Sequence, residues 1–104
     1  MDAALKAIAE PHRREILRLV WSRELSASEI AAHFDVTRPA ISQHLTVLRN
    51  ADLLAERREG TRRLYRTRTD TVAELRAFLD EYWTGGLERL RRAAESAERK
   101  KRSR

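Results

Sequence analysis

The 104-residue sequence contains no cysteine, and it has only three glycines and two prolines. Without a thiol the chain cannot form a disulfide, offer a thiolate to a metal ion or sense redox state through cysteine. With so few glycines it also has no glycine-rich loop of the kind that binds phosphate groups. These absences exclude thiolate metal centres, thiol redox chemistry and P-loop nucleotide hydrolysis.

Long hydrophobic runs are missing as well. No window approaches the roughly 20 apolar residues that a membrane span needs. The N-terminal segment MDAALKAIAEPHRR also lacks the pattern of a signal peptide. We therefore expect a cytoplasmic protein with no membrane partner.

A catalytic or metal-binding constellation is also lacking. The three histidines, His12, His33 and His44, are never four residues apart on one helix, and no nucleophile and base share a motif. Pairs of carboxylates near the C-terminus are typical of solvated helix faces. The sequence therefore predicts no enzyme activity, no cofactor and no metal site.

Positive charge is what the chain has in excess. Lys and Arg number 22 against 16 Asp and Glu, which gives a formal net charge of +6, and Arg greatly outnumbers Lys. The excess lies in two segments, residues 57–68, with six arginines against one glutamate, and residues 98–104. A polyanionic partner is the expectation. Length and composition predict one domain over 1–97, followed by a disordered basic tail over 98–104.

Helical patterns fill the N-terminal third. One short helix in DAALKAIAE precedes Pro11, and a second begins at Pro11 with a buried stripe at Ile16, Leu17 and Val20. Ser26 and Glu29 have the spacing of a capping box, which predicts a further helix of about two turns.

The segment after it separates two kinds of side chain. Thr37 is placed to cap a helix over 38–50, and Pro39 is tolerated in its first turn. Steps of 100° put one set in an apolar arc: Ala40, Ile41, His44, Leu45, Val47, Leu48 and Ala51. The opposite arc holds Arg38, Pro39, Ser42, Gln43, Thr46, Arg49 and Asn50. Two short helices joined by a tight turn, the second amphipathic, form the pattern of a helix-turn-helix.

The outer arc consists of residue types that read bases. Arg recognises guanine, Gln and Asn recognise adenine, and Ser and Thr accept several bases. We expect Arg38, Pro39, Ser42 and Gln43 to face bases, with Thr46 and Arg49 nearer the DNA backbone. Thr37, at the start of the helix, also belongs to the predicted DNA-binding set. A polar face that touches only water is the alternative. The position of His44 in the apolar arc favours a core or hydrogen-bonded role over a DNA contact, and both remain open.

A period of two follows the helix. Residues 54–59 and 62–66 alternate around the turn Glu59-Gly60-Thr61, which predicts a β-hairpin. Such a basic hairpin directly after a helix-turn-helix is expected to be a wing that reaches phosphates or the minor groove. Its predicted DNA-binding residues are Arg57, Arg58, Arg62, Arg63 and Tyr65, and Arg66 adds to the charge.

The C-terminal third has helical spacing over 70–83 and again over 87–97, and Thr84-Gly85-Gly86 predicts a break or kink between them. The apolar stripe exceeds what one small core can cover, which indicates an interface. Its members are Leu75, Phe78, Leu79, Tyr82, Trp83, Leu87 and Leu90. Packing of Trp83 inside the subunit is the alternative.

The order of these elements, with EPHRREILRLV, SASEIAAHF, TRPAISQHLTVLRNADLL and RREGTRRLYR, resembles the ArsR family of bacterial winged-helix repressors over roughly residues 3–83. The resemblance implies a mostly α fold with an α+β wing: a winged helix-turn-helix with a two-stranded β-hairpin and long terminal dimerisation helices. It also implies homodimers bound to double-stranded operator DNA, pairing through the first and last helices, which adds Leu5 and Ile8 to the interface. Arg38, Pro39, Ser42 and Gln43 match groove-facing positions, His44 matches one at the groove margin, and Arg62 and Arg63 match the wing.

The sequence departs from the metal-sensing members of that family. SASEIAAHF carries no Cys-x-Cys site, and DTVAELRAFLDEYW carries no histidine. Metal and redox sensing are therefore not expected, and the sequence identifies no small-molecule effector. The competing function is a winged-helix module whose terminal helix docks a partner protein.

Overall fold

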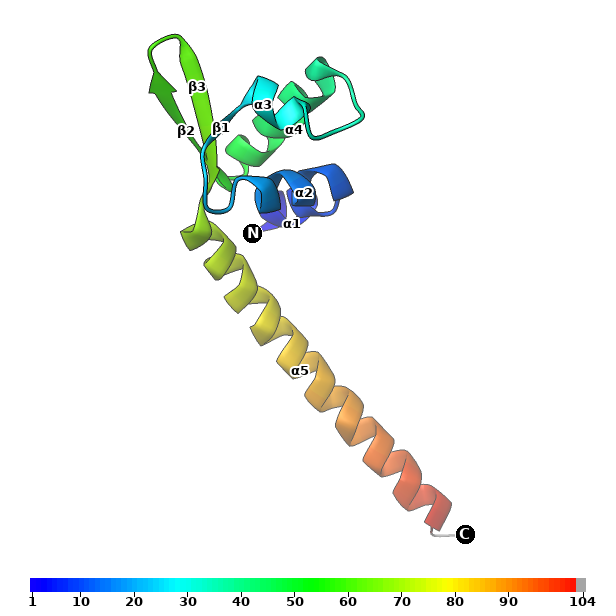
Figure 1. The fold of residues 1–104 in the computed structure, drawn as a ribbon. Coiled ribbons are helices and arrows are strands. Elements are labelled where there is room, and N and C mark those ends of the chain that lie inside the picture. The colour runs from blue at the N-terminus through cyan, green and yellow to red at the C-terminus, as the bar shows by residue number, and fades with distance from the viewer. Residues whose placement is uncertain (103–104) are drawn as a thin grey trace.

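The computed structural model describes residues 1–102 (Figure 1). Its elements in chain order are α1 (Asp2–Ile8), α2 (Pro11–Leu19), β1 (Leu25–Ser26), α3 (Ala27–Ala31), α4 (Arg38–Asn50), β2 (Leu54–Glu59), β3 (Arg62–Thr67) and α5 (Thr69–Arg102). Five helices and a small antiparallel sheet give the mostly α architecture with a wing that the sequence predicts.

Helix starts are defined by local capping, and the caps predicted at Ser26 and Thr37 are confirmed. The Glu10 carboxylate accepts the Arg13 amide at the start of α2, where Pro11 occupies the first turn. Ser26 and Glu29 form a complete capping box on α3, and the Thr37 hydroxyl accepts the Ala40 amide on α4. Each cap satisfies an amide that the helix itself leaves unpaired.

The sheet has three strands in the order β1-β3-β2, one more than the predicted hairpin. β2 and β3 pair with Glu59 opposite Arg62, and Gly60 in the turn has a φ of 62°, a left-handed conformation that glycine adopts without strain. The added strand, β1, pairs Leu25 with Tyr65. Two residues are too few to show an alternating pattern, so the sequence could not reveal this strand.

The core lies where α1, α2, α3, α4 and the base of the sheet meet, and it is built from aliphatic side chains. Its fully buried members include Ile16, Val20, Ile30, Ile41, Leu48 and Leu53. The apolar arc predicted for α4 is confirmed at Ile41, Leu45 and Leu48 but is wrong at Val47, which is 40% exposed. The buried face of α4 is therefore narrower than the apolar arc predicted from the sequence, and it excludes Val47.

α5 is one continuous helix through Arg102, so the predicted break at Thr84-Gly85-Gly86 is wrong. A glycine costs a helix about 1 kcal/mol, and this cost alone does not end a helix whose other residues favour it. Residues 98–102, which we expected to belong to a disordered tail, are also part of α5. Residues 103 and 104 of that predicted tail lie outside the described residues.

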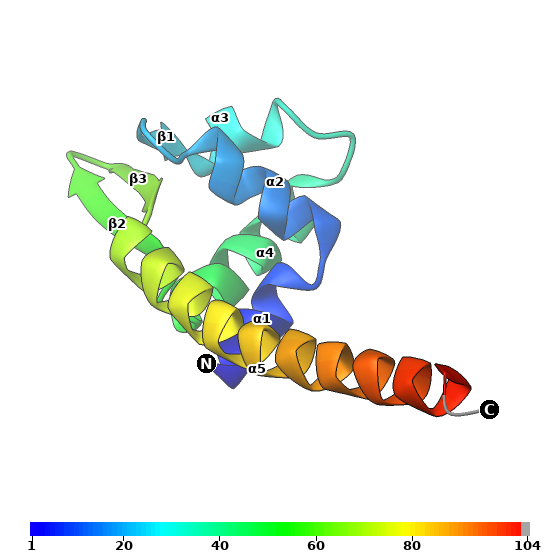
Figure 2. The ribbon, with the colours of Figure 1, turned by 90° about the horizontal axis from the view of Figure 1, so that it is seen from below.

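The length of α5 makes the molecule elongated, with a longest dimension of 74 Å. The helix leaves the base of the sheet and points away from the hairpin tip (Figure 1), and from below it extends past the edge of the body (Figure 2). Only Thr71 and Leu75 on this helix are buried. No helix within residues 1–102 combines the length and apolarity needed to cross a membrane.

Candidate nucleic-acid interface

The outer face of α4 is exposed along its length. Arg38, Pro39, Ser42, Gln43, Thr46 and Arg49 are all solvent-accessible, as is the capping residue Thr37. The helix is held by its inner face, which packs Ile41, Leu45 and Leu48 into the core. The predicted base-reading set is therefore presented outward on a firmly anchored helix.

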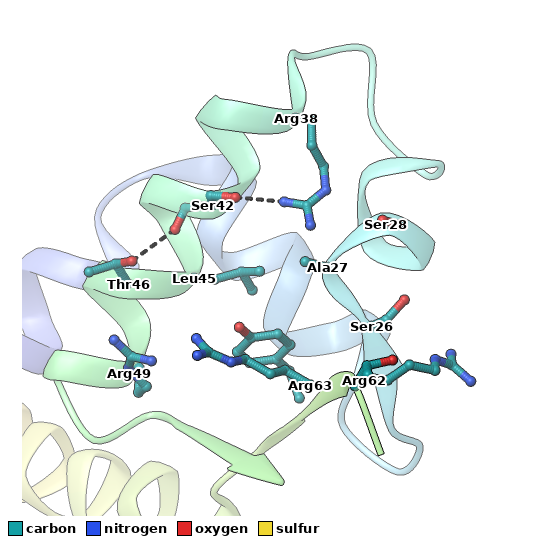
Figure 3. Close-up of a pocket in the computed structure, with 12 residues that line it drawn as sticks. Ser26, Ala27, Ser28, Arg38, Ser42, Leu45, Thr46, Arg49, Arg62 and Arg63 are labelled. Atoms are coloured by element: carbon teal, nitrogen blue, oxygen red, sulfur yellow. Dashed lines mark hydrogen bonds between the residues drawn. The ribbon is translucent and has the colours of Figure 1, made fainter. Parts of the chain in front are cut away.

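A trough of about 610 Å³ runs between α4, the start of α3 and the wing (Figure 3). Arg38, Ser42, Thr46 and Arg49 line one wall, and Arg62 and Arg63 belong to the other. Four further lining residues, Ser26, Ala27, Ser28 and Thr61, were not predicted as part of the site. The sequence predicts Ser26 only as a helix cap, and the packing of β1 and α3 beside the wing is what brings Ser26, Ala27 and Ser28 to the trough.

Two hydrogen bonds orient side chains along the trough (Figure 3). The Arg38 guanidinium donates to the Ser42 hydroxyl at 2.6 Å, and the Thr46 hydroxyl donates to the Ser42 carbonyl at 3.0 Å. The first bond bends Arg38 along the helix and places its remaining donors beside the trough. Arg38 and Ser42 thus form one unit at the N-terminal end of α4.

The pairing register divides the wing into two faces. Glu56 stands opposite Tyr65 and Arg58 opposite Arg63, so these four side chains share one face, while Arg57 and Arg62 lie on the other. Tyr65, predicted as a DNA contact, is only 8% exposed and packs in the core, although it lines the trough. Its place in the core leaves little of its ring for direct contact.

Three wing arginines, Arg57, Arg62 and Arg63, are paired with glutamates, and the sequence does not predict these pairs. Arg57 binds Glu24 through two nitrogens at 2.8 and 3.1 Å, and it also binds Glu59. Arg62 binds Glu29 at 2.6 Å. Arg58, by contrast, makes no hydrogen bond or ion pair with any residue in the described part of the chain.

These pairs keep the glutamates ionised. The hydrogen bond from Arg57 holds the pKa of the Glu24 carboxyl below its ordinary value. The pKa of Glu29 is lowered first by the Ser26 amide and hydroxyl and then by the charge of Arg62. At neutral pH the wing is therefore a set of charged pairs, and its positive excess comes from arginines in surplus over these carboxylates.

A second polar cluster joins α2 to α4. The rings of His12 and His44 stack with centroids 5.7 Å apart, His12 Nδ1 lies 2.9 Å from Glu10 Oε1, and the Arg13 guanidinium lies 3.3 Å from His44 Nδ1. Burial lowers the pKa of the His44 imidazole, and the nearby Glu10 carboxylate opposes this shift only in part. His44 is half-buried and contacts Arg13, which favours the first of the two roles left open for it.

Glu10, His12 and His44 also place three ligand-type atoms within 4.8 Å of one another. This grouping is not visible in the sequence, because His12 and His44 are 32 positions apart. However, His44 Nδ1 faces the Arg13 guanidinium, and Glu10 already accepts the Arg13 amide and approaches His12. The existing bonds suit a clamp between α2 and α4 better than a cation site.

The apolar stripe on α5 is confirmed as an exposed surface beyond Leu75. Tyr82 is 69% exposed, Trp83 65% and Leu90 66%, with Phe78, Leu79 and Leu87 also exposed. Packing of Trp83 inside the subunit is therefore wrong. Leu75 is a correction as well, because it is 4% exposed and belongs to the subunit core, against which Leu5 and Ile8 are also partly packed.

A helix-turn-helix with an exposed polar recognition face, followed by a basic hairpin that forms a trough with it, defines a winged helix-turn-helix DNA-binding protein. Residues 10–56 match the sequence profile described as "Bacterial regulatory protein, arsR family". The HTH-type transcriptional regulator Rv2034 of Mycobacterium tuberculosis is 42% identical over 86 residues, covering 83% of this chain and 80% of the relative.

Two further comparisons agree. The transcriptional repressor SdpR of Bacillus subtilis is 40% identical over 60 residues, covering 58% of this chain and 67% of the relative. A crystal structure titled as a possible transcriptional regulator for arsenical resistance superposes with a TM-score of 0.74 at 42% identity, covering 86% of this chain and 93% of that one. The chain belongs to the ArsR family of bacterial regulatory proteins and is a DNA-binding transcriptional regulator.

Proposed function

We propose that this protein is a homodimeric repressor that binds an inverted-repeat operator, with α4 in the major groove and the wing on the flanking backbone. The observation that carries the proposal is the outer face of α4, where Arg38, Ser42 and Gln43 are exposed and the first two line the trough. Because an α-helix is about as wide as the major groove, these residues reach base edges when α4 lies in it. The wing arginines then contact phosphates.

The lack of packing around most of α5 within the subunit supports the proposed dimer. Beyond Leu75 the helix has no buried residue within the subunit, whereas most of the stability of a helix in a protein comes from the packing of its apolar face. Burying the stripe from Phe78 to Leu90 against a second copy, together with Leu5 and Ile8 from α1, removes that exposed apolar surface. A two-fold dimer sets its recognition helices about 34 Å apart, which is one turn of DNA.

Residues 1–97 form one unit in this proposal, with the basic residues of 98–104 at its end. The protein acts in the cytoplasm, binds no cofactor and catalyses no reaction, and its regulatory signal is a ligand, a partner protein or the protein level alone. The alternative function, docking a different protein, has less support because the relatives reported above are named as transcriptional regulators or repressors.

Selection of bound duplexes from random DNA tests the proposal directly. We expect an enriched inverted repeat whose half-sites lie about 10 base pairs apart, and sedimentation should show a dimer of the free protein. With about six phosphate contacts, log K should fall with log salt at a slope of about −5. A flat salt response together with no enriched sequence favours the protein-docking alternative.

A further inference from the structure

Glu56 on β2 occupies an unusual place between the two DNA-binding elements. Its Oε2 accepts a hydrogen bond from Arg49 Nη1 at 2.5 Å, and its Oε1 lies 3.4 Å from Arg63 Nε. Arg49 belongs to the last turn of α4 and Arg63 to the wing. One carboxylate therefore joins the recognition helix to the wing, one oxygen for each arginine.

The position of Glu56 keeps it behind the arginines that it holds. Arg49 and Arg63 line the trough, whereas Glu56 is not among the lining residues, and its side chain is only 22% exposed. Figure 3 shows the Arg49 and Arg63 guanidinium groups together at the same end of the trough. The carboxylate is thus shielded from an approaching phosphate by the two cations in front of it.

Two guanidinium groups so close together repel each other when nothing lies between them. A carboxylate bound to both removes that repulsion and restricts two long side chains to one arrangement before DNA arrives. Without it, each arginine pays the ordering entropy at the moment of binding. Glu56 therefore lowers the entropic cost of ordering two phosphate-binding arginines that belong to two different elements.

We propose that Glu56 is a positioning residue for DNA binding: it holds Arg49 of α4 and Arg63 of the wing in a joint phosphate-binding arrangement. This inference rests on the proposed function, because it requires both arginines to contact DNA. It makes an unusual prediction about sign. Removing a negative charge near DNA ordinarily strengthens binding, but loss of the Glu56 charge should weaken it.

The test measures fluorescence anisotropy with a labelled mixed-sequence duplex of about 30 base pairs, long enough for two half-sites. Glu56→Gln should weaken binding about tenfold, within the range of coupling found for charged networks. Glu59→Gln is the matched control, since it removes the same charge from the exposed tip of the same strand. Its partner Arg57 keeps Glu24, so this control should bind equally well or up to about twofold tighter.

A double-mutant cycle separates positioning from a general structural role. In the background Arg49→Ala with Arg63→Ala, Glu56→Gln should no longer weaken binding, because the side chains it positions are gone. Equal weakening in both backgrounds, or tighter binding of Glu56→Gln in the native background, overturns the inference. If Arg49→Ala and Arg63→Ala themselves leave the affinity unchanged, the proposed DNA contacts fail instead.

Discussion

The outer face of α4 and the apolar stripe of α5 are both exposed, but they differ in side-chain chemistry and in how the helix beneath each one packs against the subunit core. The α4 face is polar and cationic, and the helix beneath it is anchored by three buried side chains, Ile41, Leu45 and Leu48. The α5 stripe is aromatic and aliphatic, and beyond Leu75 no residue of this helix is buried in the subunit.

This difference indicates how each surface gains from a partner. A rigid polar face loses little entropy when it meets a polyanion, so its specificity depends on which donors it presents. An unsupported apolar helix gains stability itself when it is covered, so its partner contributes to folding as well as to assembly. The two surfaces should therefore respond to mutation in different measurements.

The largest effect is expected on the α5 stripe. Trp83→Glu places a charge where a large aromatic side chain would be buried between copies, so the dimer should dissociate at micromolar concentration. Because two linked half-site contacts then become one, operator affinity should fall by about a hundredfold or more. Sedimentation and binding to the selected duplex measure the two losses.

Ala77→Glu provides the matched control for this variant. Ala77 is exposed on the opposite face of the same helix, so the same charge placed there should leave both dimer and affinity intact. A dimer that survives Trp83→Glu contradicts the proposed interface.

Mutation of the α4 face should reduce the preference of the protein for its operator over unrelated DNA. Arg38→Ala removes a guanidinium that Ser42 orients beside the trough, and affinity for the selected operator should fall about tenfold to a hundredfold. Affinity for unrelated duplexes should change far less, and the dimer should persist. Arg62→Ala with Arg63→Ala provides the contrast, because it should weaken binding to all sequences alike. Equal losses for Arg38→Ala on both kinds of duplex would assign that residue to the backbone.

The sequence could predict those features that depend on interactions between residues only a few positions apart. Thr37 and Ser26 cap amides three residues away, and Gly60 defines a two-residue turn, so these features are written in adjacent positions. The outward set on α4 follows from the same local periodicity. These signals were enough for the helix-turn-helix, the hairpin and the candidate DNA-binding face.

Features that depend on distant segments were missed. The pairing of Leu25 with Tyr65, the stacking of His12 on His44 and the bond between Arg49 and Glu56 all need the folded core to bring them together. The error at Gly85-Gly86 has another cause, since the small cost of glycine was treated as a stop signal. The strand register of Glu56 is a local feature that the sequence could predict, because the two-residue turn sets Glu56 opposite Tyr65.

The glycines offer a smaller and sharper test of the α5 stripe. Gly86 lies at helical spacing with Leu79, Tyr82 and Leu90, whereas Gly85 lies outside that stripe. An added Cβ at Gly85 comes no closer than 3.6 Å to Arg89, and at Gly86 no closer than 3.9 Å. Within the subunit, each Gly→Ala change should therefore stabilise the helix by about 1 kcal/mol.

The two substitutions should differ only if a partner helix approaches closely at Gly86. Gly85→Ala should raise helicity and the unfolding midpoint, measured by circular dichroism, without weakening the dimer. Gly86→Ala should give the same gain in helicity but a higher dissociation constant in sedimentation. Identical behaviour of the two variants would show that the stripe does not pack tightly there.

The smallest effect is expected at His44, on the border between the two faces of α4. Burial lowers the pKa of His44 below its ordinary 6.5, the Glu10 carboxylate opposes this shift, and the positive charge of Arg13 adds to it. The unfolded chain therefore takes up this proton at a higher pH than the folded one does. Stability should rise with pH through the window just below 6.5 and be lost as pH falls through it.

Urea unfolding at pH 7 and pH 5 measures this loss, and His44→Gln should reduce it. The exposed His33 is the control, because His33→Gln should leave the pH dependence as it is. Glu10 does not obscure the result: hydrogen bonds from His12 and Arg13 outweigh its burial and lower its pKa below 4.5, so its contribution is lost only at more acidic pH. An unchanged pH dependence in His44→Gln would mean that the inner face of α4 is anchored by its aliphatic residues alone.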